Sequence, residues 1–371
     1  MRVVFCGGGT GGHVYPALTV ASALKRAVEG PLDLLYIGVR GKIDAELVAR
    51  EGIPFASVTA GPLRTPTRLG TLAGGMKLIA GVAQSYMLLR RFRPDVVFAT
   101  GGYGSVGVGL AARLRRLPLL LFEPGPEAGL AVKLLAKYAD RIAVTIPPAR
   151  DMMPAAKTTM PGYPVRPAFF GRDRDQARFH LFINHDLPVV LVSGASSGST
   201  TLNDAAIELA KTFLEHGQLL HLTGPRDEQR VSDVRKSFPP ALAERWVIKA
   251  YLHGDDMADA LTASDLAIMR AGASTLGELP ATRLPSILVP GEYEGWAQTP
   301  NAAYMEKEGA SVLLPQSRIA ELPTLVESLI ADTARLEKMR DVLSSLSRPY
   351  AADDLASLVI EMAGARRKVA A

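Results

Sequence analysis

The sequence predicts an α/β fold made of two Rossmann-like domains, and three observations carry this prediction. Short apolar strands alternate with amphipathic helical stretches along the chain. Most of these strands are apolar on both faces, which is typical of parallel strands covered by helices. The alternation also begins twice, and 371 residues are more than a single core usually supports. We therefore expect two parallel sheets that face each other across a cleft.

The first half is expected to hold short buried strands with helices between them. MRVVF (1–5) is predicted as a strand, and a helix over 15–28 follows because its apolar residues recur at helical spacing. A helix of small residues is expected from Ser105. The remaining strands of this half are predicted at 32–38, 95–100, 118–122 and 141–145.

A proline-rich segment separates this half from a second cycle of strands and helices. PGYPVRPAFF (161–170) holds three prolines, which disfavour a helix or a central strand. The second half contains predicted helices at 201–216 and 274–281. Its strands are predicted at 188–193, 218–222, 246–250, 265–269 and 285–289. The predicted organisation is an N-terminal domain (1–163), a linker (164–170), a C-terminal domain (171–345) and a C-terminal helix (346–371) that packs back on the N-terminal domain.

Composition limits the compartment and the partners. The chain has one cysteine, Cys6, so it forms no internal disulfide, and its N-terminus shows no basic segment followed by an apolar signal core. We therefore expect a cytoplasmic protein. A net charge of +5 favours anionic partners, although a scattered basic surface explains it equally well. Nucleic acid is disfavoured, because the sequence shows no zinc-finger spacing, RNA-binding aromatic signature or long Lys/Arg block.

A glycine-rich loop follows the first strand of each half: GGGTGGH (7–13) and SGASSGST (193–200). Such a turn at a helix N-terminus offers free N–H groups to a phosphate or an oxyanion. Ligands of doubly wound sheets lie beyond the carboxyl ends of the strands, so both loops are expected at the cleft. His13 is a candidate general base that takes a proton from an attacking hydroxyl. The alternative is that His13 only caps the helix.

The spacing Gly7-x-Gly9-x-x-Gly12 also matches a dinucleotide-binding fingerprint. That interpretation expects an acidic residue at the end of the second strand to hold the ribose. The strand ends instead at Gly38-Val39-Arg40, where an arginine suits only a 2′-phosphate. A nicotinamide-dependent dehydrogenase is therefore the weaker hypothesis.

Eight segments resemble, in order and spacing, the MurG family of glycosyltransferases, and together they cover essentially the whole chain. The segments are GGGTGGHVYPALTVASAL, the G-x-x-x-x-IDAELV segment (38–48), GGYGSVG (101–107), PGYPVRP, SGASSGSTTLN (193–203), HGDDMADAL (253–261), RAGASTLGE (270–278) and LPSILVP (284–290). The resemblance implies a GT-B fold and an inverting transferase. Its implied donor is UDP-N-acetylglucosamine, and its implied acceptor is the undecaprenyl-linked lipid I, which becomes lipid II, a peptidoglycan precursor.

The resemblance also implies roles for N-terminal residues. His13 would be the base that activates the acceptor hydroxyl. The other implied acceptor-binding residues are Thr10, Gly11, Gly12, Gly101, Gly102, Tyr103, Glu123 and Gly125. Backbone N–H groups at Gly101 and Gly102 would receive the acceptor's pyrophosphate. These glycines alternatively just permit a tight helix start.

The donor is implied to bind the C-terminal domain. The implied donor-binding residues are Arg166, Ser196, Gly198, His253, Gly254, Arg270, Gly272, Ala273, Ser274, Glu278, Gln298 and Asn301. Glu278 would accept hydrogen bonds from both ribose hydroxyls, although a solvated carboxylate in a helix's first turn is the plain alternative. The helix dipole and N–H groups would stabilise the leaving diphosphate, so no cofactor and no protein metal site are expected. Mg²⁺ would act, if at all, through the diphosphate.

Several ligand-facing positions depart from the family pattern. The departures are Pro124 and Gly125 in place of Gln-Asn, Ser197 in place of glutamine, Ser199-Thr200 in place of Ala-Arg, and Ala297 in place of the first of two glutamines. Glu127 is an added acid. Each lost polar contact is worth roughly 0.5–1.5 kcal/mol, enough to change the preferred sugar or acceptor. A related lipid or natural-product glycosyltransferase and a non-catalytic sugar-nucleotide-binding protein are therefore the alternatives.

The segment 69–94 places apolar residues beside cations. The cations Lys77, Arg90, Arg91 and Arg93 lie near seven apolar residues: Leu72, Met76, Ile79, Tyr86, Met87, Leu88 and Leu89. Such a helix can rest on the cytoplasmic face of an anionic membrane, or it can pack its apolar residues inside the domain. We weigh the two interpretations evenly. Peripheral association with the inner face of the bacterial membrane follows from the first, and other proteins of cell-wall synthesis are further candidate partners.

Overall fold

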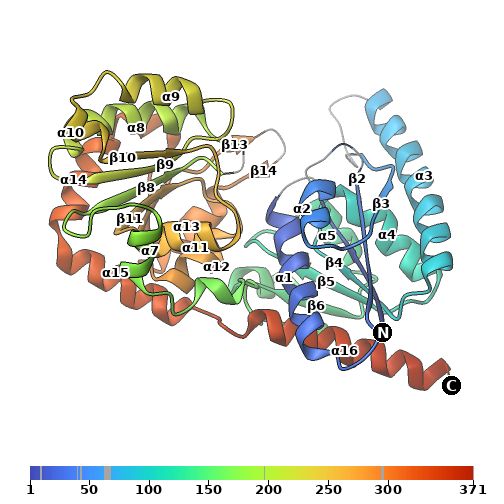
Figure 1. The fold of residues 1–371 in the computed structure, drawn as a ribbon. Coiled ribbons are helices and arrows are strands. Elements are labelled where there is room, and N and C mark those ends of the chain that lie inside the picture. The colour runs from blue at the N-terminus through green and yellow to red at the C-terminus, as the bar shows by residue number, and fades with distance from the viewer. Residues whose placement is uncertain are drawn as a thin grey trace. The chain divides into compact units, whose positions relative to one another are not determined.

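The structure is a computed structural model and describes residues 1–8, 11–39, 41, 44–61, 68–195, 197–293 and 296–370; at 68–73, 292–293, 296–297 and 367–370 only the backbone is described. It divides into two compact units (Figure 1). Unit 1 comprises Met1–Val165 and Tyr350–Ala371, and unit 2 comprises Arg166–Pro349. Each unit is built around its own parallel sheet, as the sequence predicts.

Unit 1 holds a seven-stranded sheet in the order β3-β2-β1-β4-β5-β6-β7. Every neighbouring pair in it is parallel, for example Val4 opposite Val97 in β1 and β4. Its strands are β1 (Arg2–Cys6), β2 (Asp33–Val39), β3 (Phe55–Val58), β4 (Val96–Ala99), β5 (Leu119–Glu123), β6 (Arg141–Val144) and β7 (Thr158–Thr159). The strand order reverses between β1 and β4, which makes their carboxyl ends the switch point where ligands of such sheets bind.

Helices cover both faces of this sheet (Figure 1). The helices of unit 1 are α1 (Gly11–Ala27), α2 (Asp44–Arg50), α3 (Arg68–Phe92), α4 (Tyr103–Leu114), α5 (Leu130–Leu135), α6 (Pro147–Asp151) and α16 (Ala351–Ala370), with a short 3₁₀ turn at Ala155–Lys157. Helix α16 contacts α1, and Arg26 of α1 pairs with Asp353 of α16 at 2.9 Å. Helices α3 and α4 cross closely, because Gly81 lies against Gly107 with no side chain between them.

Unit 2 repeats this plan with a six-stranded sheet in the order β10-β9-β8-β11-β12-β15. Its strands are β8 (Val189–Ser193), β9 (Gln218–Leu222), β10 (Trp246–Lys249), β11 (Leu266–Met269), β12 (Ser286–Leu288) and β15 (Ser311–Leu313), and a separate antiparallel pair joins β13 (Glu292–Tyr293) to β14 (Trp296–Ala297). Its helices are α7 (Arg174–His180), α8 (Thr200–Phe213), α9 (Glu228–Arg235), α10 (Pro240–Ala243), α11 (Gly254–Ala263), α12 (Thr275–Thr282), α13 (Thr299–Lys307), α14 (Leu322–Ala331) and α15 (Thr333–Leu346), with 3₁₀ turns at Pro167–Phe169 and Gln316–Glu321. The switch point lies between β8 and β11.

One predicted boundary is wrong in a way that matters for the site. The first helix was expected from residue 15 but begins at Gly11, so Gly12 and His13 belong to its first turn. Glycine has low helix propensity, which is why the pattern favours a loop there. His13 therefore sits on a helix rather than on the preceding loop.

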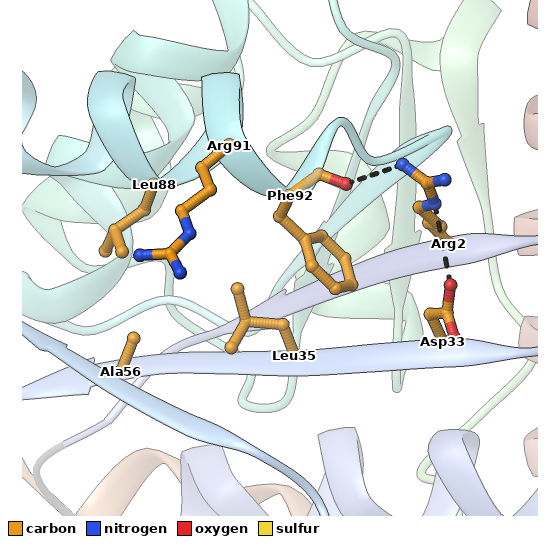
Figure 2. A pocket seen from close by; sticks show the side chains of 7 residues that line it. All are labelled: Arg2, Asp33, Leu35, Ala56, Leu88, Arg91 and Phe92. Atoms are coloured by element: carbon orange, nitrogen blue, oxygen red, sulfur yellow. Dashed lines mark hydrogen bonds and ion pairs between the residues drawn. The ribbon is translucent and has the colours of Figure 1, made fainter.

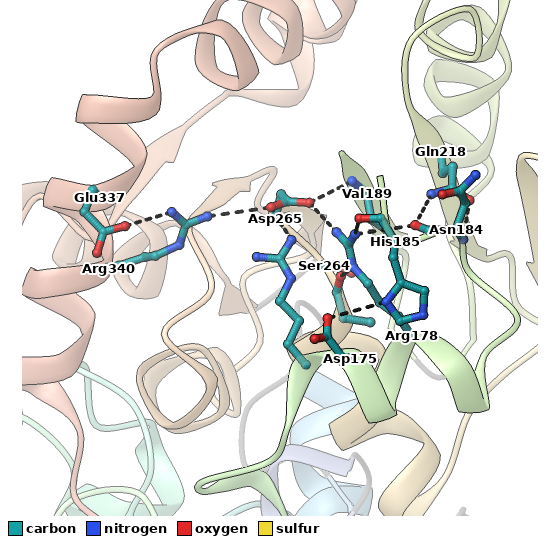
Figure 3. Close-up of polar contacts among 12 residues, drawn as sticks. Asp175, Arg178, Asn184, His185, Val189, Gln218, Ser264, Asp265, Glu337 and Arg340 are labelled. Carbon is teal, nitrogen blue, oxygen red and sulfur yellow. Dashed lines mark hydrogen bonds and ion pairs between the residues drawn. The ribbon is translucent and has the colours of Figure 1, made fainter. Parts of the chain in front are cut away.

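A buried ion-pair network fastens α7 and α15 to the amino ends of the strands in unit 2 (Figure 3). Asp265, directly before β11, accepts hydrogen bonds from Arg178 at 2.9 Å and from the backbone N–H of Val189 at 2.9 Å. Arg174 also pairs with it, and Arg340 lies 3.8 Å away. The Arg178 side chain is buried, so its positive charge needs the Asp265 carboxylate as a counter-ion.

Replacing Asp265 by alanine is expected to lower the free energy of unfolding of unit 2 by about 3 kcal/mol or more, because Arg178 would keep a buried charge without its partner. Both tryptophans, Trp246 and Trp296, lie in unit 2, so their fluorescence during urea unfolding reports on this unit. Glu208→Ala, which removes an exposed pair with Lys211, is the control and should change the free energy by less than about 1 kcal/mol. Equal small effects of both variants would contradict the assigned role of Asp265.

Candidate functional site

His13 is held by the loop that follows β4. Its Nδ1 lies 2.6 Å from the carbonyl oxygen of Thr100, and the Thr100 hydroxyl donates to the carbonyl of His13 at 2.7 Å. A carbonyl oxygen only accepts, so Nδ1 carries the hydrogen in the neutral ring and Nε2 keeps its lone pair. The loop after β4 thereby fixes a proton-accepting nitrogen on the first turn of α1, at the switch point of unit 1.

The protonation of His13 fits this arrangement. Burial lowers the pKa of His13 below its ordinary value of 6.5, while the Thr100 carbonyl and the charge of Asp44 oppose this effect. The neutral form therefore dominates at neutral pH. A neutral imidazole with a free Nε2 is the state that a general base requires.

Two glycines form the surface on which the imidazole lies. Gly101 and Gly102 have φ of +83° and +74°, a region that side chains rarely adopt. A β-carbon at Gly101 would lie 3.4 Å from Cε1 of His13, and one at Gly102 would lie 2.7 Å from the carbonyl oxygen of Gly8. Only glycine fits at both positions. We call His13, Thr100, Gly101 and Gly102 the His13 cluster.

Other predicted residues of unit 1 lie around the same edge of its sheet. Tyr103 begins α4 and is exposed, and Gly11 lies in the first turn of α1. Glu123 ends β5 and accepts a hydrogen bond from the N–H of Gly125 at 2.9 Å. Burial raises the pKa of Glu123 to about 8. Thr10 lies outside the described residues.

In unit 2, Gly198 of the loop after β8 packs directly against Gly224. Gly198 has φ of +73°, and a β-carbon on it would lie 2.2 Å from the carbonyl oxygen of Thr223. Ser199 caps α8, since its hydroxyl accepts a hydrogen bond from the N–H of Leu202. The predicted residue Ser196 lies outside the described residues. The close approach of Thr223 is thus the reason that position 198 requires glycine.

Arg270, directly after β11, ties the loops of this switch point together. One terminal nitrogen donates to the Ser199 hydroxyl at 2.7 Å and to Gln316 at 2.7 Å. The other donates to the carbonyl oxygens of Val289 and Pro290, each at 3.2 Å. The side chain is buried. These contacts make Arg270 a support of the loops, which the sequence did not indicate.

Glu278 lies in the first turn of α12, after Gly272, Ala273 and Ser274. Burial raises the pKa of Glu278 to about 7, while the charge of Arg166 and a hydrogen bond from Ser274 lower it. The carboxyl group therefore titrates near neutral pH. This property distinguishes it from an ordinary solvated carboxylate in a first turn.

The start of α11 lies beside the same arginine. Gly254 has φ of +56°, and a β-carbon on it would lie 3.8 Å from Nη1 of Arg166. His253, the exposed residue before it, packs its ring edge-to-face on Tyr251 at 4.5 Å. We call Arg166, Gly254, Ser274 and Glu278 the Glu278 cluster.

Gln298 and Asn301 make contacts that differ from the predicted ones to a sugar. Gln298 is only 5% exposed, and its Oε1 accepts a hydrogen bond from the N–H of Gly291 at 2.9 Å. Asn301 donates to the carbonyl oxygen of Ala271 at 2.7 Å. Both side chains brace the loops after β11 and β12. The sequence could not indicate this, because an amide side chain serves backbone and ligand equally well.

In unit 1, Asp44 acts on His13 of the His13 cluster but was not predicted as a site residue. It is the first residue of α2, and its side chain is fully buried. Its charge acts on His13. Its position inside the IDAELV segment was the available signal, but an acidic residue at a helix start is ordinarily a cap.

A cavity of about 410 Å³ lies in unit 1, away from the His13 cluster (Figure 2). It is lined by Arg2, Asp33, Leu35, Ala56, Leu88, Arg91 and Phe92. Arg2 and Asp33 are the first residues of β1 and β2, so the cavity touches the amino ends of the strands. The predicted chemistry lies at their carboxyl ends. Across the described residues, His, Cys, Asp and Glu side chains form no group of three that could hold a metal ion.

Comparison with known proteins identifies relatives over nearly the whole chain. Residues 3–144 match the glycosyltransferase family 28 N-terminal domain, and residues 189–355 match the glycosyltransferase family 28 C-terminal domain. A protein of Desulforudis audaxviator (strain MP104C) is 38% identical over 98% of this chain and 99% of its own length. It is named UDP-N-acetylglucosamine–N-acetylmuramyl-(pentapeptide) pyrophosphoryl-undecaprenol N-acetylglucosamine transferase. A protein of Halothermothrix orenii with the same name is 35% identical, with coverage of 98% and 99%.

The fold has solved counterparts. The crystal structure of Acinetobacter baumannii MurG aligns with a TM-score of 0.75 at 24% identity and covers 97% of this chain and 99% of that chain. This likeness establishes the fold, two Rossmann-like domains of the GT-B type.

Proposed function

We propose the reaction of this protein from one premise: the chain belongs to glycosyltransferase family 28. The family resemblance seen in the sequence is thereby confirmed, as is the prediction of a hexosyltransferase. The proposed reaction moves N-acetylglucosamine from UDP-N-acetylglucosamine to the muramoyl 4-hydroxyl of the undecaprenyl-linked lipid I. The named activity of relatives at 38% and 35% identity over nearly full length supports this choice.

The observation that carries the mechanism is the geometry of His13. With Nδ1 donating to the Thr100 carbonyl, Nε2 is left to take the proton of the acceptor hydroxyl. The hydroxyl oxygen forms a bond to the anomeric carbon, and the bond from that carbon to the β-phosphate oxygen breaks. UDP leaves from the opposite face, so the configuration inverts.

Unit 2 holds the donor in this proposal. Glu278 binds the ribose hydroxyls, and Gly254 with His253 lies beside the uracil. The N–H groups of the loop 194–199 and the N-terminus of α12 stabilise the charge that develops on the diphosphate. The reaction then needs no protein-bound metal, and Mg²⁺ contributes only by pairing with the diphosphate.

Unit 1 holds the acceptor. Backbone N–H groups at Gly101 and Gly102 bind the pyrophosphate, since successive N–H groups in such turns form a concave anion site. Glu123 fits beside an anion only in its neutral form. Its pKa of about 8 provides that form at neutral pH.

The neutral form of Glu123 predicts that acceptor binding weakens at high pH, which gives the pH profile a basic limb. Above about pH 8, Glu123 gains a negative charge that repels the pyrophosphate, so the apparent affinity for the lipid acceptor should fall. Steady-state assays from pH 6.5 to 9.5 with varied acceptor measure this, and Glu123→Gln should abolish the basic limb. Glu127→Gln, an exposed acid four residues along, serves as the control. A limb that persists in Glu123→Gln would assign it to another group.

The proposed function is tested by incubating the protein with UDP-N-acetylglucosamine and lipid I. Formation of lipid II with stoichiometric release of UDP is the expected result. Parallel reactions with other UDP-sugars and other polyprenyl or natural-product acceptors address the substitutions at Gly125, Ser197 and Ala297. Transfer only to another acceptor would replace the proposed substrate, and UDP binding without any transfer would favour a non-catalytic protein.

We further propose that unit 1 rests on the cytoplasmic face of an anionic membrane through α3. Met76, Ile79 and Met87 are 61%, 72% and 61% exposed and follow one face of the helix. Lys77, Arg90 and Arg91 supply cations beside them. Leu89 is fully buried, so the packing interpretation holds for that side of the helix. Along the described residues, each helix is too short or too polar to span a bilayer.

Ile79→Glu is expected to weaken partitioning onto phosphatidylglycerol vesicles at least about tenfold, because it removes an apolar side chain that the membrane would cover and adds a charge of the same sign as the lipid. Vesicle co-sedimentation measures the change. Phe179→Glu is the matched control, since Phe179 is 73% exposed and lies in unit 2. Equal loss in both variants, or no loss in Ile79→Glu, would contradict the assignment of α3.

A further inference from the structure

Asp44 is a buried carboxylate that the proposed reaction does not use. Its side chain is 0% exposed, and its Oδ2 accepts a hydrogen bond from the N–H of Val39 at 3.3 Å. A β-carbon at Gly8 would lie 2.2 Å from this oxygen, and one at Gly38 would lie 3.0 Å from it. The carboxylate therefore reaches from α2 across the end of β2 to the turn that leads into α1.

That turn leads directly into the first turn of α1, which holds His13. The Thr100 hydroxyl, which donates to the His13 carbonyl, occupies the space beside Gly7: a β-carbon there would lie 2.1 Å from its oxygen. The Tyr36 hydroxyl lies 3.4 Å from the same point. The side chains of Asp44, Thr100 and Tyr36 thus form a polar layer beneath the turn.

Asp44 supplies the charge in this polar layer. Arg2 and Asp33 lie at the amino ends of β1 and β2, and the titratable groups farther along the nearby strands are Cys6 of β1, Tyr36 of β2 and Glu123 of β5. Burial raises the pKa of Cys6 and Tyr36 well above neutral pH and that of Glu123 to about 8, so all three are predominantly uncharged at pH 7. The carboxylate of Asp44 is the charge that raises the pKa of His13 against the effect of burial.

We propose that Asp44 is a positioning residue for His13: it fixes the turn that leads into α1 and stabilises the imidazolium formed when His13 takes the acceptor's proton. This inference rests on the proposed function of His13 as the base. The proton moves from the acceptor hydroxyl to Nε2, so the ring gains one positive charge, which the Asp44 carboxylate offsets. A cap for α2 needs only an oxygen, whereas this role needs the negative charge.

Asp44→Asn separates the two roles, because asparagine keeps the accepting oxygen and removes the charge. We expect the pKa of His13, measured by NMR on protein with ¹⁵N-labelled histidine, to fall by at least about 0.5 in the variant. The resonance is assigned by its loss in His13→Gln. Turnover should fall about tenfold with an unchanged KM for UDP-N-acetylglucosamine, and the acidic limb of the pH profile should move to lower pH.

The control is Asp33→Asn, which changes an exposed carboxylate at the opposite end of β2. Asp44→Ser, which keeps a smaller capping oxygen, replaces Asp44→Asn if that variant does not fold. A His13 pKa that is the same in the folded variant and in the wild type overturns the proposal. Failure of the proposed function would show separately, as a wild-type protein that forms no lipid II.

Discussion

His13→Ala is expected to lower turnover at least ~100-fold while the affinity for UDP stays unchanged, since a general base contributes about 10²–10⁴-fold and His13 belongs to unit 1, whereas the residues predicted to bind the donor belong to unit 2. Without an imidazole, the acceptor hydroxyl must lose its proton to water in the transition state. Single-turnover measurement of UDP release gives the rate, and calorimetry gives the affinity for UDP.

Two variants separate the base from a structural role. His13→Asn keeps a side-chain N–H that can donate to the Thr100 carbonyl but has no nitrogen that accepts a proton, so it should lose as much turnover as alanine. His216→Ala removes an exposed histidine that bonds Glu327 at 2.8 Å in unit 2, and it should leave turnover unchanged. Near-wild-type turnover in His13→Asn would show that the hydrogen bond to Thr100, rather than proton transfer, is what matters.

The pH profile provides an independent test of the same residue. Because burial lowers the pKa of His13 below 6.5, the neutral base persists into mildly acidic solution. Turnover should therefore be constant near pH 7 and decline only as pH falls through this lowered pKa. The residual activity of His13→Asn should lack this acidic limb.

The central strands were predictable because burial on both faces leaves a strong signal. The uninterrupted apolar runs at 3–6 in β1, 189–192 in β8 and 266–269 in β11 are fully buried and fit a central strand. The short strands β3, β7 and β15 were missed. Each has two to four residues and partly exposed positions, so nothing in the sequence separates them from loops.

The site was predictable in its backbone and less so in its side-chain contacts. Glycine loops after strands place N–H groups at a switch point whatever the rest of the chain does, and this identified the neighbourhood of His13 and Gly198. The contacts of Arg270 and Gln298 depend on loops up to 71 and 7 residues distant in sequence, which no local pattern encodes. Asp44 was missed for the same reason, since its partner His13 lies on another element.

Helix α3 shows why the sequence alone could not separate the buried residues of this segment from the exposed ones. Leu89 faces the core, while Met76, Ile79 and Met87 face outward from the same helix. Composition cannot distinguish the buried residue from the exposed ones, because all four are apolar. The division comes from the packing partner, α4, whose small residues accept only one side of α3.

The affinity for UDP is expected to increase about tenfold between pH 6 and pH 8, because the Glu278 carboxyl has a pKa of about 7 and only its ionised form accepts hydrogen bonds from both ribose hydroxyls. Burial raises this pKa, so the acid is mostly protonated at pH 6 and mostly ionised at pH 8. Binding should also release a proton near pH 7, which calorimetry in buffers of different ionisation enthalpy detects. Uridine, which lacks the phosphates, should show the same dependence.

Glu278→Gln is expected to weaken UDP binding at least about tenfold at pH 8 and to remove the pH dependence, since its amide accepts with one oxygen and cannot ionise. Glu308→Gln, at an exposed position of unit 2, is the matched control. Deoxyuridine diphosphate completes a double-mutant cycle. Loss of the 2′-hydroxyl should weaken binding to the wild type but have little effect on Glu278→Gln, because the group that contacts it is already changed. Equal losses in both proteins would mean that Glu278 does not contact the ribose, and that its raised pKa reflects burial beside Arg166 alone.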